Sequence, residues 1–340
     1  MSGKLRIGLA GLGRMGRIHA TNLGSRCARA ELAAVFDVDS AAADRIAEEH
    51  GVTGVDSFER LLAADIDAVA ITTPTGTHAD LAVAAARAGK HVFCEKPISL
   101  DREAALRAIA AVEAEGVAFQ IGFHRRFDPD WVAATERIHA GELGEIALLR
   151  TSLRDMAAPK AEFLAGSGGL FLDVTIHDLD TARWMAGEIT EVSAHGAVVS
   201  DPGFTAIGDV DTAVVVLRFA NGALGVIDNS RAAGYGYECS TEVLGSLATV
   251  RIDHPQSRHY EWRTPGQAAT PLVRDFEQRY PFAYAAELDA FADAVRTGTP
   301  VRASGSDALA AFDLATAADR SWREERAIPV RCTESGYVLG

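Results

Sequence analysis

Apolar and polar residues follow two different patterns along this chain, and the change falls near Gly122. Before that point, short apolar runs predict buried strands, and longer stretches with helical apolar spacing predict helices. The expected strands are 5–10, 31–36, 68–72, 92–94 and 117–121; the expected helices are 15–23, 41–50, 79–88 and 103–115. This alternation predicts an α/β architecture over residues 1–122, a doubly wound parallel sheet of the Rossmann type.

After Gly122 most apolar segments look like strands that follow one another closely, and Asn221-Gly222 is a strong hairpin signal. The expected strands are 146–151, 191–199, 212–219, 223–229, 238–244 and 248–252; the expected helices are 131–139, 170–185, 284–296 and 306–323. We therefore predict a second, α+β domain over residues 123–340. Its sheet is expected to be open and mostly antiparallel, with helices on one face.

The run Ala213–Leu217 is entirely apolar, which predicts a strand covered on both faces. Helices of the same chain are expected to cover only one face of this sheet. A second copy of the chain would cover the other, so we predict a homo-oligomer.

The composition and charge of the chain argue against several classes of partner and several cellular locations. The net charge of −14 argues against nucleic acid and anionic membranes as partners. No secretion signal is visible before the first strand, and no apolar stretch approaches the length of a membrane span. The cysteines are scattered and suggest neither a disulfide framework nor a zinc site. We expect a cytoplasmic protein.

A glycine-rich motif follows the first expected strand: Gly11-Leu12-Gly13-Arg14-Met15-Gly16. The first glycine of such a motif permits a tight turn, the second lets the pyrophosphate approach the backbone, and the third lets helix and strand pack closely. The N-terminus of the next helix supplies N–H groups to the phosphates. This motif alone is weak, but the strand–helix–strand context supports dinucleotide binding.

Asp37 closes the second expected strand, where an acidic residue binds the ribose 2′-hydroxyl and repels a 2′-phosphate. Ser40 is a better helix N-cap than Asp37. NAD is therefore the expected cofactor. Further along, Thr72-Thr73-Pro74 and His78 follow another strand and are expected to contact the cofactor.

Glu95-Lys96-Pro97 ends the strand that begins near Lys90. Ligands of open α/β sheets bind outside the carboxyl ends of the strands. A lysine at this position reaches a substrate hydroxyl beside the nicotinamide, although a surface lysine before a turn is the simpler interpretation of the tripeptide alone. Glu95 and Lys96 are therefore both candidates for the cofactor region.

A second cluster of candidate residues lies on the helix expected over 170–185. Asp173 and His177 are four positions apart and share a helix face, and Asp180 adjoins them. Histidine is the usual base for removing a hydroxyl proton. A surface ion pair on a capped helix remains an alternative. A metal site is disfavoured because no third ligand has a clear spacing.

Together, these motifs resemble the glucose–fructose oxidoreductase, inositol dehydrogenase and rhizopine-catabolism (Gfo/Idh/MocA) family over nearly the whole chain. The similarity is strongest to bacterial inositol 2-dehydrogenases. It rests on 11–16, 95–97 and Asp173 with His177, and on 122–128, Arg154-Asp155, 169–180 and 284–288.

The resemblance implies His177 as general base, Lys96 as a partner of the reacting hydroxyl, and Asp173 as an anchor for the substrate or for Lys96. It implies a homotetramer built on the open sheet. It also places the remaining substrate contacts at Asp180, Tyr235 and Tyr284, and on a loop with Arg154 and Asp155.

Two stretches depart from the inositol dehydrogenase pattern: Met156–Pro159 and Glu238–Ser240. These departures leave the identity of the substrate undecided. The expected function is NAD-dependent oxidation of a secondary hydroxyl of a cyclic polyol. The alternatives are an aldose (pyranose) dehydrogenase, a sugar ketoreductase, and a non-catalytic NAD(H)-binding regulator. The intact set Lys96, Asp173 and His177 argues against the regulator.

Overall fold

The computed structural model of the chain describes residues 3–164, 166–253 and 260–340. It separates into two compact units. The first contains Met1–Asp128 and Phe282–Leu309, and the second contains Pro129–Pro281 and Ala310–Gly340. No helix among the described residues combines the length and apolar character needed to cross a membrane.

The first unit is built on a six-stranded parallel sheet with the order β3-β2-β1-β4-β5-β6. Its strands are β1 (Leu5–Ala10), β2 (Ala30–Phe36), β3 (Thr53–Val55), β4 (Ala68–Ile71), β5 (His91–Cys94) and β6 (Phe119–Ile121). This is the strand order of the dinucleotide-binding Rossmann fold. The order reverses between β1 and β4, so the carboxyl ends of these strands border the crevice where such folds bind ligands.

Helices connect these strands. They are α1 (Arg14–Thr21), the π-helical turn η1 (Asn22–Arg26), α2 (Ser40–His50), α3 (Phe58–Ala63), α4 (His78–Arg87) and α5 (Arg102–Glu115). Short 3₁₀ turns lie at η2 (Thr75–Thr77) and η3 (His124–Phe127). The predicted strands and helices are present, whereas β3 and α3 were missed because their apolar runs are short.

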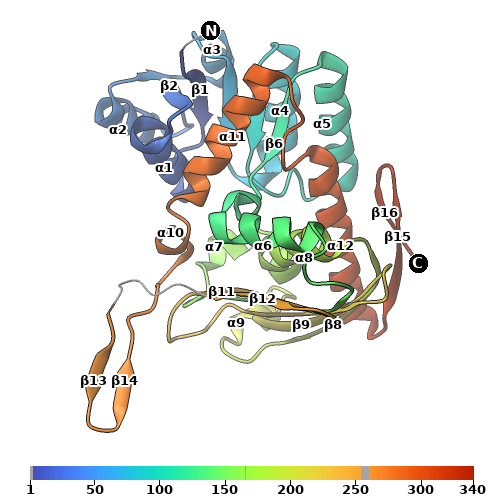
Figure 1. Cartoon of the computed structure of the whole chain (residues 1–340). Helices are drawn as coiled ribbons and strands as arrows, with labels where there is room; N and C mark the ends of the chain where they lie inside the picture. Colours follow the sequence, from blue (N-terminus) through green and yellow to red (C-terminus); the bar gives the residue numbers. More distant parts are fainter. Residues whose placement is uncertain (1–2, 165, 254–259) are drawn as a thin grey trace. The chain divides into compact units, whose positions relative to one another are not determined.

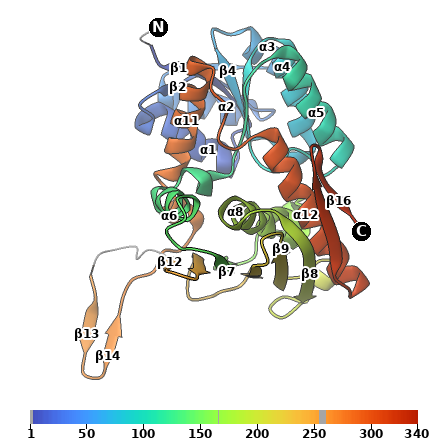
Figure 2. The same ribbon diagram turned by 45° about the vertical axis from the view of Figure 1, so that its right-hand side comes forward.

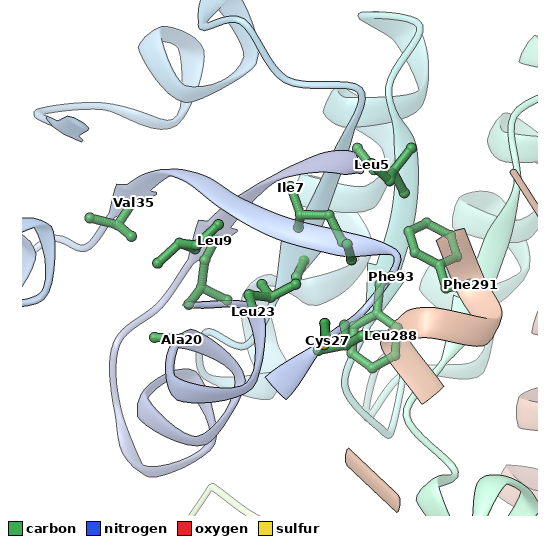
Figure 3. Packing of buried hydrophobic residues seen from close by; sticks show 14 of the residues in the cluster. Leu5, Ile7, Leu9, Ala20, Leu23, Cys27, Val35, Phe93, Leu288 and Phe291 are labelled. Carbon is green, nitrogen blue, oxygen red and sulfur yellow. The ribbon is translucent and has the colours of Figure 1, made fainter. Parts of the chain in front are cut away.

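The chain returns to the first unit through α11 (Ala283–Thr297), which packs against α1, η1 and β5 (Figure 1). Figure 3 shows Leu288 and Phe291 of α11 beside Phe93 and Cys27 in the buried core. The division predicted from sequence, 1–122 and 123–340, did not assign this helix to the Rossmann unit. Local periodicity reveals that α11 is a helix, but it does not reveal which distant core its apolar face joins.

The second unit contains an eight-stranded mixed sheet with the order β12-β11-β7-β10-β9-β8-β15-β16. Its strands are β7 (Ile146–Arg154), β8 (Ile189–Ala197), β9 (Thr212–Phe219), β10 (Leu224–Ser230), β11 (Glu238–Gly245), β12 (Thr249–Ile252), β15 (Ile328–Thr333) and β16 (Gly336–Leu339). Only the β10–β7 pair is parallel among these strands, so the prediction of a mostly antiparallel sheet is confirmed. β15 and β16 were not predicted.

One face of this sheet is covered by helices, as Figure 2 shows for α8 and α12. The helical segments of the unit are α6 (Pro129–His139), α7 (Ala161–Leu164), η4 (Phe171–Thr175), α8 (Ile176–Ala186), α9 (Gly203–Ala206), α10 (Phe276–Arg279) and the later part of α12 (Gly305–Glu324). A small separate hairpin is formed by β13 (Trp262–Thr264) and β14 (Gln267–Ala269).

The other sheet face is open within the chain. Along β9, Ala213, Val215 and Leu217 are buried, whereas Val214 and Val216 are at least 40 % exposed. Helices of the chain therefore cover only one face of this strand, as predicted, and the covering of the other face by a second copy stays a prediction.

Candidate active site

The glycine-rich loop has the geometry that pyrophosphate binding requires. Gly11 has a φ of +89°, and a Cβ there would lie 2.6 Å from the backbone nitrogen of Thr73. A Cβ on Gly16 would lie 2.0 Å from the carbonyl oxygen of Gly11, so both positions require glycine. At Gly13, which caps α1, a Cβ would meet no atom within 4 Å. Backbone N–H groups are therefore approachable there, with Arg14 exposed and Met15 half-buried at the start of the helix.

Asp37 directly follows β2, as the sequence predicted. Its Oδ2 accepts a hydrogen bond from the backbone nitrogen of Leu12 at 2.6 Å, and its Oδ1 accepts one from Asp39 at 2.9 Å. The carboxylate thus orders the glycine-rich loop and lies where a ribose would bind. The N-cap of α2 is Asp39 rather than Ser40, because the Asp39 side chain accepts a hydrogen bond from Ala41.

The segment after β4 is held against the glycine-rich loop. The Thr72 hydroxyl donates to the Gly11 carbonyl at 2.6 Å, and the hydroxyls of Thr73 and Thr77 are 2.7 Å apart. Pro74 is exposed beside them. These contacts keep 72–74 at the carboxyl edge of the sheet, beside the proposed cofactor.

His78 has a structural role instead of the predicted contact with the cofactor. It is 2 % exposed, its Nδ1 lies 2.9 Å from the Pro97 carbonyl, and its Nε2 lies 2.7 Å from the Thr73 carbonyl. Both ring nitrogens are occupied by backbone oxygens. The histidine therefore links the segments that follow β4 and β5.

Lys96 lies at the carboxyl end of β5 and is half-buried, as predicted. Glu95, in contrast, points into the protein and is 7 % exposed. Its Oε1 is 2.8 Å from His19 Nε2, and its Oε2 accepts from the backbone nitrogen of Lys96 at 3.3 Å. The predicted cofactor contact of Glu95 is therefore wrong for its carboxylate, which anchors Lys96 instead.

In the second unit, Asp173 and His177 lie on consecutive helical segments. Asp173 belongs to the π-helical turn η4, and His177 lies in the first turn of α8. The sequence predicted one continuous α-helix. A π-helical turn is a feature often found at functional sites, and it changes the angular spacing of the side chains it carries. Asp173 and His177 are half-buried, whereas Asp180 is buried.

Arg231 is a residue of this site that sequence reasoning missed. Its side chain is 1 % exposed, and its Nη2 lies 3.0 Å from Asp173 Oδ2. A buried guanidinium is costly without an anionic partner, and the Asp173 carboxylate supplies one. From the sequence, an arginine after a strand looks like an ordinary surface residue. No spacing rule links it to a helix so far away in the chain.

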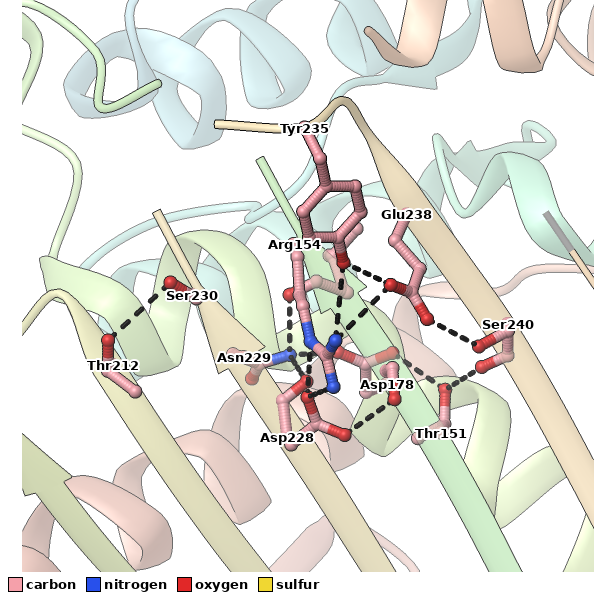
Figure 4. Close-up of polar contacts among 12 residues, drawn as sticks. Thr151, Arg154, Asp178, Thr212, Asp228, Asn229, Ser230, Tyr235, Glu238 and Ser240 are labelled. Atoms are coloured by element: carbon pink, nitrogen blue, oxygen red, sulfur yellow. Dashed lines mark hydrogen bonds and ion pairs between the residues drawn. The ribbon is translucent and has the colours of Figure 1, made fainter. Parts of the chain in front are cut away.

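The helix that carries His177 is fixed to the sheet by buried hydrogen bonds, drawn in Figure 4. Asp178 Oδ1 accepts from the Thr151 hydroxyl of β7 at 3.0 Å, and its Oδ2 accepts from the Asn229 amide of β10 at 2.7 Å. Asn229 Oδ1 in turn accepts from Thr175 at 2.6 Å. Because these groups are buried and paired, they hold the start of α8 in one position.

Arg154 lies on the opposite face of the sheet, so its predicted place on a loop over the site is wrong. It is the last residue of β7, one position beyond the inward-facing Leu153. Its guanidinium donates to Asp228 at 2.7 Å and to Tyr235 and Glu238 at 3.2 Å (Figure 4).

Arg154 faces two carboxylates, Asp228 and Glu238, on this open face. Burial lowers the pKa of Arg154, but its bonds to Tyr235 and Asp228 outweigh burial and raise the pKa overall. Tyr235 also donates to Glu238, and burial together with Glu238 raises the pKa of Tyr235. Tyr235 and the unexpected Glu238 thus belong to the Arg154 cluster. Asp155 follows β7, and its backbone bonds Ser230 and Ala233.

Tyr284 was predicted to contact substrate but is buried in the first unit. It is 3 % exposed, and its ring lies 4.9 Å from that of His124 and 5.9 Å from that of His19. The motif was recognised correctly as a helix, yet its tyrosine faces the core that α11 joins.

The fold and the glycine-rich loop define the class of protein: a dinucleotide-binding protein with a Rossmann domain. Comparison with known families agrees. Residues 5–123 match the oxidoreductase family with an NAD-binding Rossmann fold, and residues 131–251 match the Gfo/Idh/MocA C-terminal domain. The chain belongs to the Gfo/Idh/MocA family.

Its relatives are similar over almost their full length. Inositol 2-dehydrogenase of Rhizobium meliloti is 42 % identical, with 96 % of this chain and 99 % of that protein covered. The scyllo-inositol 2-dehydrogenase (NAD(+)) of Bacillus subtilis is 38 % identical, with 95 % of each covered. A crystal structure of scyllo-inositol dehydrogenase from Lactobacillus casei with bound NAD(H) and scyllo-inositol has a TM-score of 0.90 at 33 % identity, covering 96 % of this chain and 99 % of that one.

Proposed function

We propose that this protein oxidises a secondary hydroxyl of a cyclic polyol, with inositols as the first substrate class. The observation that carries the proposal is Lys96 at the carboxyl end of β5, in the sheet whose neighbouring strands carry the nucleotide-binding loops. The names of the relatives support an inositol as substrate.

The residues around the glycine-rich loop fit NAD. The α1 N-terminus and the open position at Gly13 would hold the pyrophosphate, and Asp37 would accept hydrogen bonds from the ribose hydroxyls. Bound NAD supplies the acceptor for the hydride that leaves the substrate carbon.

His177, Lys96 and Asp173 have different roles in the proposed reaction. We assign His177 as the base that takes the hydroxyl proton on an imidazole nitrogen, because a neutral imidazole accepts a proton near neutral pH. The Lys96 ammonium donates a hydrogen bond to the same oxygen and stabilises its developing negative charge. Asp173 lies against Arg231, so we assign it to orient neighbouring groups instead of taking the proton. Oxidation should therefore fall at low pH, where a protonated His177 accepts nothing.

A substrate panel tests this proposal. With NAD, we expect turnover of myo- or scyllo-inositol to exceed that of D-glucose and D-xylose, and lactate and cyclohexanol to fail. A site built to bind several hydroxyls leaves its own polar groups unpaired when they are missing. Lactate or cyclohexanol above the polyols would overturn the assignment. Glucose or xylose above every inositol would favour a pyranose dehydrogenase.

The same proposal includes a homotetramer assembled through the open sheet face. Four large apolar side chains on this face are at least 40 % exposed: Val214, Val216, Leu224 and Leu244. Exposed apolar side chains gathered on one face are typical of an interface. Light scattering at micromolar concentration should give an oligomer, and Val216→Lys should dissociate it. A monomeric wild-type protein would refute this part.

A further inference from the structure

A buried acidic cluster lies directly behind Lys96 in the first unit, and the function above does not use it. It joins His19 of α1, Glu95 after β5 and Glu287 of α11, whose side-chain nitrogen and carboxylate oxygens lie within 4.8 Å of one another. His19 and Glu287 are fully buried, and Glu95 nearly so. Three segments far apart in the sequence therefore place two carboxyl groups side by side in the core.

Glu95 is held tightly in this cluster. One oxygen meets His19 and the other accepts from the Lys96 backbone. A Cβ on Gly122 would lie 2.9 Å from the Glu95 carboxylate, so the neighbouring chain packs directly against it. Movement of this carboxylate would therefore move the backbone that carries Lys96.

Glu287 has a different environment. Neither of its carboxyl oxygens has a hydrogen-bond partner among the described residues, and no lysine or arginine pairs with it there. Gln120 fixes its backbone by donating to the Glu287 carbonyl at 2.7 Å. Two ionised carboxylates this close would repel each other strongly in a buried site, which favours a state in which one of them keeps its proton.

We propose that Glu287 is a positioning residue: it stays uncharged in this cluster and so allows Glu95 to hold the backbone of Lys96 in place. The proposal rests on the proposed role of Lys96. Loss of the Glu287 proton would place a second negative charge beside Glu95 and drive that carboxylate away from the Lys96 N–H. The cluster thus couples a buried proton to the geometry of the site.

Electrostatics agree with this geometry. Burial, followed by the charge of Glu95, raises the pKa of Glu287 well above its ordinary value. Among the other titratable groups that face this region, His19 is paired with Glu95. Burial, then Asp289, raises the pKa of the Cys27 thiol to about 12 despite Lys4. The Tyr284 ring meets the His19 ring edge-on and lies at an interplanar angle of 34° to the His124 ring.

A divalent cation is the other way to neutralise two carboxylates beside a histidine. The contacts favour the proton. Both Glu95 oxygens already accept hydrogen bonds, and the direct 2.8 Å contact between Glu95 and His19 leaves no ion between them. Metal binding is nevertheless an outcome that the experiment distinguishes.

The test compares the wild-type protein with Glu287→Gln, which keeps the shape of the acid and cannot ionise. A group whose pKa is raised on folding destabilises the protein as pH rises from its unfolded value through its folded value. The Tm of Glu287→Gln should therefore exceed that of the wild type by a margin that widens above about pH 4.5. Glu115→Gln, at an exposed glutamate, is the matched control and should show no such widening.

Activity gives the second measurement, made with the polyol that the panel selects. The alkaline decline of kcat in the wild type should move up by a pH unit or more in Glu287→Gln, whereas the Kd for NADH stays the same. Glu95→Gln should lower kcat at all pH values, by up to about 10²-fold for a misplaced group.

Three results would overturn the proposal. Identical Tm–pH curves would mean that Glu287 carries no buried proton. Identical kcat–pH profiles would mean that its proton does not act on Lys96. A stoichiometric metal in the wild type that Glu287→Gln loses, together with a more than tenfold loss of kcat at pH 7, would make Glu287 a ligand. The Tm measurement needs no substrate, so it stands even if no polyol is oxidised and the proposed function fails.

Discussion

The carboxyl edge of the parallel sheet and the open face of the mixed sheet both display polar and charged residues, but they differ in what determines the position of each residue. At the parallel edge, Asp37, Thr72 and Lys96 follow three strands whose carboxyl ends point the same way. On the mixed sheet, Arg154 and Leu153 are adjacent but face opposite sides. The parallel topology places the first three residues at one edge of the sheet. On the mixed sheet, the alternation of side chains along a strand decides which face Arg154 and Leu153 occupy.

The largest effects are expected for substitutions at the carboxyl edge of the parallel sheet, where Lys96 lies, and at the start of α8, where His177 lies. Lys96→Ala and His177→Ala should each lower kcat by about 10²–10⁴-fold, because each removes a group that handles the reacting hydroxyl. NADH binding, followed by fluorescence, should persist in both variants. Retention of more than about half the activity by either variant would reject the role assigned to that residue.

The next effect compares a buried ion pair with an exposed one. Asp173→Ala leaves the buried Arg231 without its partner and should cost about 3–5 kcal/mol of unfolding free energy. Asp228→Ala, beside the one-third exposed Arg154, should cost about 1 kcal/mol or less. Urea denaturation measures both. Equal losses would show that the two pairs are buried alike, against the structure.

These comparisons explain which features the sequence could predict. The positions of the glycine-rich loop, Asp37 and Lys96 could be predicted because each follows a strand of a parallel sheet. The carboxyl ends of parallel strands all lie at the same edge of the sheet. Glu95, one residue from Lys96, was misplaced because adjacent residues point in opposite directions. His78 and Tyr284 were misplaced because burial depends on packing partners distant in sequence. The Arg231–Asp173 pair had no local signal at all.

A smaller effect is expected for cofactor choice. Asp37→Ser removes the charge that would repel a 2′-phosphate, so the NAD-over-NADP ratio of kcat/KM should fall on the order of tenfold, or about 1.4 kcal/mol. Part of the loss should appear as weaker binding of both cofactors, because Asp37 also holds the Leu12 amide. A wild-type preference for NADP would reject the assignment of Asp37.

The smallest effect on catalysis is expected for a substitution of Arg154. This substitution distinguishes most directly between the carboxyl edge of the parallel sheet and the open face of the mixed sheet. Its guanidinium bonds Asp228, Tyr235 and Glu238 on the open face, away from the helix that carries His177. Arg154→Ala should therefore change kcat/KM by less than about threefold, an effect under 1 kcal/mol, when it is measured at a concentration at which the protein is fully assembled. It should instead weaken assembly, because it leaves Asp228 and Glu238 facing the apolar interface without a counter-charge. Sedimentation at decreasing concentration measures this. A large loss of kcat/KM with unchanged assembly would return Arg154 to the substrate site, as the sequence first indicated.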